Sequence, residues 1–109
     1  MNETLARRLS LAGFPQDTSE FILRKYSLAK EPMRMERPPK DLDLAVLSGK
    51  LKWELAFPRL EEIMYELGDD FKSLFHFKDG WLAENGSDME HFNNPYEALV
   101  HLYESKHPI

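Results

Sequence analysis

Residues 58–84 have the sequence PRLEEIMYELGDDFKSLFHFKDGWLAE, in which the spacing of the apolar residues changes from a helical to an extended pattern. Apolar residues at i, i+3, i+4 and i+7, counted from Leu60, predict a helix from Pro58 to Leu67. Beyond Gly68, apolar and polar residues alternate on both sides of the turn signal Asp79-Gly80, which predicts a hairpin. A helix followed directly by a hairpin indicates the α+β class.

Two further helices are expected at the two ends of the chain. Asn2 can cap a helix over about Glu3–Ala12, and Asn94 can cap a longer one over about Pro95–Lys106. The apolar aromatic-bearing segment Phe21–Tyr26 predicts a strand. These three elements extend the α+β pattern in both directions.

The segments between these elements are less regular. Three of the seven prolines fall between Lys30 and Lys40, which predicts a basic proline-containing loop over about residues 27–41. Over Asp41–Phe57 a hairpin and a short helix at residues 42–47 fit almost equally, and an irregular segment followed by a strand near Leu51–Leu55 is favoured. Residues 85–93 are expected to form a polar loop.

The predicted architecture is a single α+β domain over residues 1–109, with about three helices packed on a small, mostly antiparallel sheet. At this length one compact core is expected, and 42% hydrophobic and 30% charged residues are ordinary for a globular fold. We expect the apolar residues to be used in that core, which would leave no organised reactive centre. The aromatic set Phe71, Phe75, Phe77, Trp81 and Phe92 is likewise assigned to the core.

Composition and charge exclude several classes of protein. Without cysteine there are no disulfides, thiolate metal sites or cysteine nucleophiles. No apolar stretch has the length of a signal peptide or a membrane span, so a soluble cytoplasmic protein is expected. Residues 1–59 carry 11 Lys/Arg against 8 Asp/Glu, a net +3, whereas residues 60–109 carry 3 against 11, a net −8. The acidic half disfavours nucleic acid as a partner because it repels phosphate.

Three segments together resemble those of small hypothetical proteins of phages and mobile elements. The start, Thr4–Leu9 leading into Ala12–Thr18, is similar to their short helix that ends in an "AGFPQ"-like corner. Pro58–Ile63 resembles their "PTLEEL" helix, and the hairpin with Asn94–Tyr103 resembles their "PEEALAELYL" ending. The resemblance implies a small α+β fold and a mobile-element origin. That family has no established activity, so no site residue is carried over.

One group of residues could hold a divalent metal. Glu97, His101 and Glu104 share one face of the last predicted helix, at spacings of four and three. The H-E-x-x-H spacing of zinc proteases is absent, so a solvated helix face is the favoured interpretation. The oxygen-rich segment Asn85–His91 does not match a calcium-binding EF-hand loop either.

No motif for catalysis or cofactor binding is found. The adjacent carboxylates Glu61-Glu62 and Asp69-Asp70 diverge by about 100° where the chain is helical, so neither pair faces a common pocket. The five glycines do not cluster as in a phosphate-binding loop, and no G-x-S-x-G sequence occurs. We therefore expect no catalytic, cofactor-binding or metal-binding residues and no bound cofactor.

The sequence thus predicts a non-enzymatic accessory or protein-interaction domain of phage or mobile-element origin. The residues expected to face a partner are Trp53, between two charged neighbours, and Arg34 and Arg37 of the basic loop. The expected partner is a protein, either a different one or a second copy in a homodimer. Two alternatives stay open: an acidic decoy that inhibits a basic host protein, and a metal-dependent enzyme that uses the Glu97/His101/Glu104 face.

Overall fold

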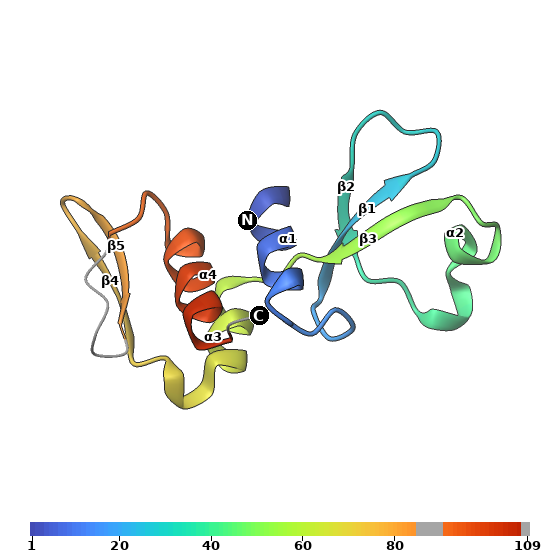
Figure 1. Cartoon of the computed structure of the whole chain (residues 1–109). Helices are drawn as coiled ribbons and strands as arrows, with labels where there is room; N and C mark the ends of the chain where they lie inside the picture. Colours follow the sequence, from blue (N-terminus) through green and yellow to red (C-terminus); the bar gives the residue numbers. More distant parts are fainter. Residues whose placement is uncertain (85–90, 108–109) are drawn as a thin grey trace.

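Three helices lie between two antiparallel sheets in the computed structural model, which describes residues 1–84 and 91–107 (Figure 1). The helices of this central layer are α1 (Glu3–Leu11), α3 (Leu60–Leu67) and α4 (Pro95–Lys106). α4 packs against α1, α3 and the hairpin, and α1 also contacts the three-stranded sheet. A fourth helix, α2 (Leu44–Leu47), lies apart from this layer (Figure 1).

The predicted α+β class with antiparallel strands is confirmed, but the strands divide into two sheets. The first sheet has the order β2-β1-β3, and the second is the hairpin β4-β5. The strands are β1 (Phe21–Tyr26), β2 (Met33–Glu36), β3 (Leu51–Ala56), β4 (Ser73–Phe77) and β5 (Gly80–Glu84). Helices therefore pack between two small sheets, and not on one face of a single sheet.

The end helices begin where their capping residues predict. The side chain of Asn2 accepts a hydrogen bond from the Leu5 amide at 2.9 Å, and that of Asn94 accepts one from the Glu97 amide at 2.8 Å. Each cap satisfies an amide that has no partner within the helix. The sequence therefore located these two helices and the strand β1 closely.

The interpretation of residues 30–40 as a loop is wrong, because β2 lies inside that segment. Met33–Glu36 pairs antiparallel with β1, from Phe21 opposite Glu36 to Arg24 opposite Met33. Pro32, Pro38 and Pro39 flank the strand and do not interrupt it. An edge strand of four residues between prolines keeps its ladder donors, which is why the proline count misled the prediction.

Residues 41–57 contain a short helix followed by a strand, so the strand predicted near Leu51–Leu55 is confirmed, whereas the favoured irregular segment before it and the alternative hairpin are wrong. A 3₁₀ turn at Lys40–Leu42 leads into α2, and β3 follows at Leu51–Ala56. The next helix begins at Leu60, not at Pro58, and Arg59 occupies its N-cap position. The carboxylate of Glu62 accepts a hydrogen bond from the Arg59 amide at 2.9 Å, and this bond fixes the start of α3.

The hairpin turn differs from the predicted Asp79-Gly80 turn by one residue. Phe77 pairs with Gly80, so the turn residues are Lys78 and Asp79, and neither has a positive φ. Gly80, at φ +132°, begins β5 where the Phe92 backbone pairs with Trp81 through hydrogen bonds of 2.7 and 2.8 Å. A Cβ at position 80 would collide with the Phe92 carbonyl oxygen. Glycine is therefore required by a close backbone approach as well as by φ.

Replacing Gly80 with alanine is expected to lower the free energy of unfolding by about 2 kcal/mol, since backbone strain and a backbone collision combine. Gly49 is the matched control, because its φ is +71° but a Cβ there meets no atom within 4 Å. Gly49→Ala is expected to cost only about 1 kcal/mol, from strain alone. Urea unfolding of both variants measures the difference, and equal losses would contradict the close approach at Phe92.

The buried core is centred on α4. Leu99 and Val100 are fully buried there, and Leu5 and Leu9 of α1 and Ile63 of α3 join the same cluster. Phe71, Trp81 and Phe92 pack against this cluster as predicted. Phe75 and Phe77 do not, because they lie on the outer face of the hairpin with 42% and 46% exposure.

Candidate docking surface around α2

The short helix α2 presents apolar side chains to solvent. Leu44, Val46 and Leu47 are 75%, 55% and 73% exposed. This contradicts the expectation that the apolar residues are used in the core. We refer to these three side chains as the α2 patch.

A single helical turn does not hold itself together in water, because nucleation costs more than one or two hydrogen bonds return. Within α2 and its ends, the Leu47 amide donates to the Asp43 carbonyl at 3.1 Å and the Ser48 amide to the Leu44 carbonyl at 2.9 Å. Because they are mostly exposed, the side chains of the α2 patch make few of the packing contacts that normally stabilise a helix. Contacts from neighbouring elements must therefore hold α2 in place.

One such contact comes from Arg24 of β1, whose side chain is 4% exposed. Its guanidinium donates two hydrogen bonds to Asp43, the residue immediately before α2, and Nε donates to Glu54 of β3 at 2.7 Å. A bidentate arginine–carboxylate pair fixes both partners in orientation as well as in distance. Arg24 thus anchors the start of α2 to the face of the sheet.

Arg37 extends this arrangement on the far side of Glu54. Its Nη1 lies 3.7 Å from the Glu54 carboxylate, and the remaining nitrogens donate to the carbonyls of Ser19 (2.9 Å) and Gln16 (2.7 Å). Two arginines and two carboxylates from β1, β3 and the segment 37–43 form one ion-pair network. In the part of the chain that the structure describes, no buried side-chain nitrogen or oxygen lacks a hydrogen-bond partner.

Arg24 is suited to hold its two carboxylate partners in place and not to transfer protons. The hydrogen bonds that Arg24 donates to Asp43 raise the pKa of Arg24 far above its ordinary value, although burial opposes this shift. A guanidinium that stays protonated at every accessible pH cannot act as a general acid or base. The buried charges near α2 therefore position the helix.

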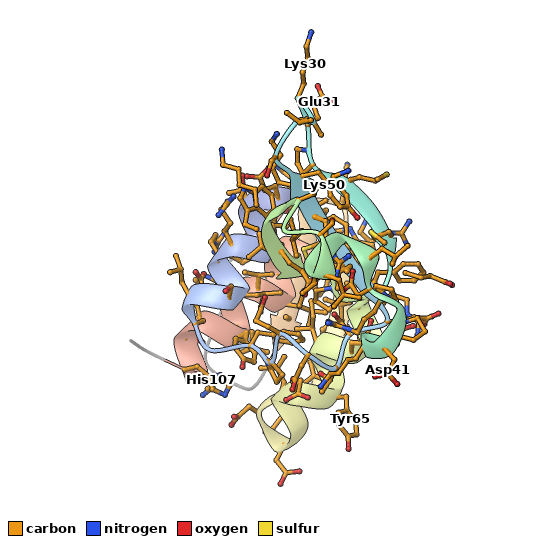
Figure 2. The ribbon with its side chains drawn as sticks, turned by 90° about the vertical axis from the view of Figure 1, so that its right-hand side faces the viewer. Lys30, Glu31, Asp41, Lys50, Tyr65 and His107 are labelled. Atoms are coloured by element: carbon orange, nitrogen blue, oxygen red, sulfur yellow. The ribbon has the colours of Figure 1, made fainter. Side chains whose placement is uncertain are left out.

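Two hollows border α2, and each contains a lysine. One, of about 480 Å³, is lined by Tyr26, Leu44, Leu47 and Lys50. The other, of about 370 Å³, contains the Arg24 network together with Val46 and Lys40. Figure 2 looks onto this end of the molecule, with Lys50 beside α2 and Asp41 farther along the same segment.

The three predicted partner-facing residues are not brought together, and only Arg37 lies beside α2. By the strand register, Trp53 and Arg34 lie on the sheet face opposite to Arg24 and Glu54. The Arg7 guanidinium covers the half-buried Trp53 ring at 4.5 Å, and that of Arg34 lies 4.1 Å from the Phe21 ring. Arg37 belongs to the network described above.

The residues of the proposed metal face do not form a metal-binding group. The carboxylate of Glu104 accepts a hydrogen bond from Arg8 Nε at 3.1 Å and forms an ion pair with the same guanidinium. The His101 ring packs 4.9 Å from that of Phe92. Over residues 1–84 and 91–107, no three His, Asp or Glu side chains are grouped so that they could hold an ion. The suggested calcium segment lies mostly outside the described residues.

Sequence reasoning missed both parts of the α2 surface. The apolar residues at 44, 46 and 47 are visible in the sequence, but their pattern indicates burial equally well. The Arg24 network joins residues 19 and 30 positions apart, and no local pattern indicates such a contact. Within the described residues, no helix is long and apolar enough to cross a membrane.

Comparison with known proteins adds no identification, since no protein-family model, no curated protein and no solved structure matches this chain. The resemblance to phage and mobile-element proteins therefore stays a prediction.

Proposed function

We propose that this protein is a non-enzymatic interaction module that uses the α2 patch to dock a partner protein. The observation that carries the proposal is the exposure of three aliphatic side chains on one helical turn, held in place by a buried ion-pair network. Exposed apolar clusters with a polar rim are characteristic of interaction sites. Fixing the turn in advance lowers the entropy that binding would otherwise cost.

The charge around the patch selects the chemistry of the partner. Lys40 and Lys50 are both exposed; Lys50 is the charged residue lining the hollow beside Leu44 and Leu47, whereas Lys40 shares the hollow at Val46 with Asp17. A partner segment that places apolar side chains on the patch would bring its flanking residues close to these lysines. Carboxylates at those flanking positions would be attracted, and lysines or arginines would be repelled. The partner we propose is therefore an acidic amphipathic segment of a protein.

The acidic-decoy alternative is less well supported. A decoy for a nucleic-acid-binding protein needs an array of unneutralised carboxylates. Several carboxylates of this chain are instead paired with arginine: Glu3 with Arg7, Glu104 with Arg8, and Glu61 with Arg59. The metal-dependent alternative is also less well supported, because the Glu104 carboxylate that would bind the metal is paired with Arg8.

A designed peptide tests the docking proposal directly. We expect a fluorescein-labelled amphipathic peptide with leucines on one face and glutamates on the other to bind, and its counterpart with lysines in place of the glutamates not to bind. Leu44→Ser/Leu47→Ser is expected to weaken binding at least about tenfold, since burial of each leucine contributes roughly 1.5 kcal/mol or more. Fluorescence anisotropy gives both affinities, and binding of the acidic peptide should weaken as salt rises.

Leu11→Ser is the matched control, because Leu11 is also exposed (72%) but lies on α1. It should bind the peptide like the unaltered chain. Both serine variants should keep their free energy of unfolding within about 0.5 kcal/mol, as exposed positions usually do. Equal binding by the two variants, or equal binding of the two peptides, would refute docking at α2.

A further inference from the structure

A third hollow lies between α3 and the turn that precedes β1, away from the α2 patch. It has a volume of about 300 Å³ and is lined by Phe14 and Thr18 on one side and by residues of α3 on the other. Phe14 is buried against the core, with its ring 5.5 Å from that of Tyr103. We refer to this hollow as the α3 groove.

Carboxylates surround this apolar groove. Glu61, Glu62 and Glu66 line it, and residues 60–70 contain five acidic residues and no lysine or arginine. The neighbouring Arg59 lies within ion-pair distance of Glu61 (3.3 Å) and Glu62 (3.6 Å). The Glu66 carboxylate, by contrast, forms no ion pair or hydrogen bond with another residue of the described chain. Its charge is available to a ligand.

The groove also has an exposed aromatic side. Tyr65 is 84% exposed. Its ring and its hydroxyl form no ring contact or hydrogen bond with another residue of the described chain. Figure 2 shows Tyr65 projecting from the end of the molecule opposite to Lys30 and Glu31. A tyrosine ring near carboxylates favours a cation, because the face of the ring attracts positive charge.

We propose that the α3 groove binds an arginine or lysine side chain from a basic segment of a partner protein. The aliphatic stem would lie along Phe14, and the cationic head would reach Glu66 and the Tyr65 ring. Long basic side chains combine these two properties, an apolar stem and a charged end. This site is separate from the α2 patch and selects the opposite charge, so the chain would contact two different kinds of protein segment.

The test uses the free side chain as its probe. N-acetylarginine amide is titrated into the ¹⁵N-labelled protein, and the amide chemical shifts are followed by NMR. Saturable shift changes are expected at residues 14–18 and 61–66. N-acetylcitrulline amide has nearly the same shape without the charge and is expected to produce much smaller changes.

Two substitutions, at the half-buried Glu66 and the exposed Tyr65, locate the contacts without changing a core residue. Glu66→Gln is expected to weaken binding of the arginine probe about tenfold, because a charge-assisted contact is lost. Tyr65→Ala is expected to weaken it about threefold. Glu31→Gln removes the same charge at the far end of the molecule and is the matched control, expected to leave the affinity unchanged.

Several results would overturn this assignment. They are shift changes scattered over other acidic positions, equal responses to the arginine and citrulline probes, and equal affinities of the Glu66→Gln and Glu31→Gln variants. Leu44→Ser/Leu47→Ser should leave arginine binding intact. Failure of the α3 groove is therefore distinguishable from failure of docking at α2.

Discussion

Replacing Arg24 with methionine is expected to lower the free energy of unfolding by about 3 kcal/mol. The side chain is nearly completely buried and pairs with Asp43 and Glu54, so its removal leaves two carboxylates without their closest cation. Desolvated charges that lose a partner cost more than the pair itself contributes. Urea unfolding of the variant, compared with the unaltered chain, measures the loss.

The same substitution should also impair docking, although it changes no residue of the α2 patch. Asp43 immediately precedes α2, and its bidentate pair with Arg24 links that helix to the sheet. Without this link the turn is not expected to persist, so the acidic peptide should bind at least about tenfold more weakly. Binding at full strength would show that the network does not position α2.

Two further variants separate the charge from its geometry. Arg24→Lys keeps a cation but cannot form the bidentate contact, so an intermediate stability is expected. Arg24→Met/Asp43→Asn/Glu54→Gln removes the whole buried charge set and is expected to regain part of the lost stability. If the triple variant were less stable than Arg24→Met alone, unpaired carboxylates would not be the cause of the loss.

The parts of the fold that the sequence predicted well are those specified locally. Asn2 and Asn94 each bond an amide three residues ahead, so the signal and its effect lie in the same few residues. The apolar, aromatic-bearing composition of β1 is equally local. The prediction at β2 was wrong because its strand pairing depends on Phe21–Arg24, a segment that the local composition of residues 33–36 does not reveal.

The candidate sites depend on tertiary contacts more than the two end helices and β1 do. Arg37 was expected to face a partner because it lies in a basic segment, yet backbone carbonyls at Gln16 and Ser19 occupy its donors. Tyr65 falls between the apolar positions of α3, and only the packed helix shows that it is exposed beside Phe14. Charge composition did anticipate one feature, since the acidic bias of residues 60–109 includes the carboxylates of the α3 groove.

Whether the leucines of α2 serve binding or stability can be decided by one matched pair of substitutions. Leu99→Ala is expected to lower the free energy of unfolding by about 3 kcal/mol, because a fully buried leucine leaves a cavity in the core. Leu44→Ala makes the same chemical change at an exposed helical position and is expected to change stability by less than about 0.5 kcal/mol. Denaturant titrations with equal m-values give the two differences.

Comparing Leu44→Ala with Leu99→Ala tests a binding role for α2, because natural sequences rarely place several exposed aliphatic residues on one turn without such a role. A small loss for Leu44→Ala, together with weaker binding of the acidic peptide, would mean that α2 contributes to recognition and not to the core. A loss for Leu44→Ala comparable to that for Leu99→Ala would instead mean that the α2 leucines are buried in the folded protein in solution. In that case the docking surface would not exist, and the Arg24 network would serve stability alone.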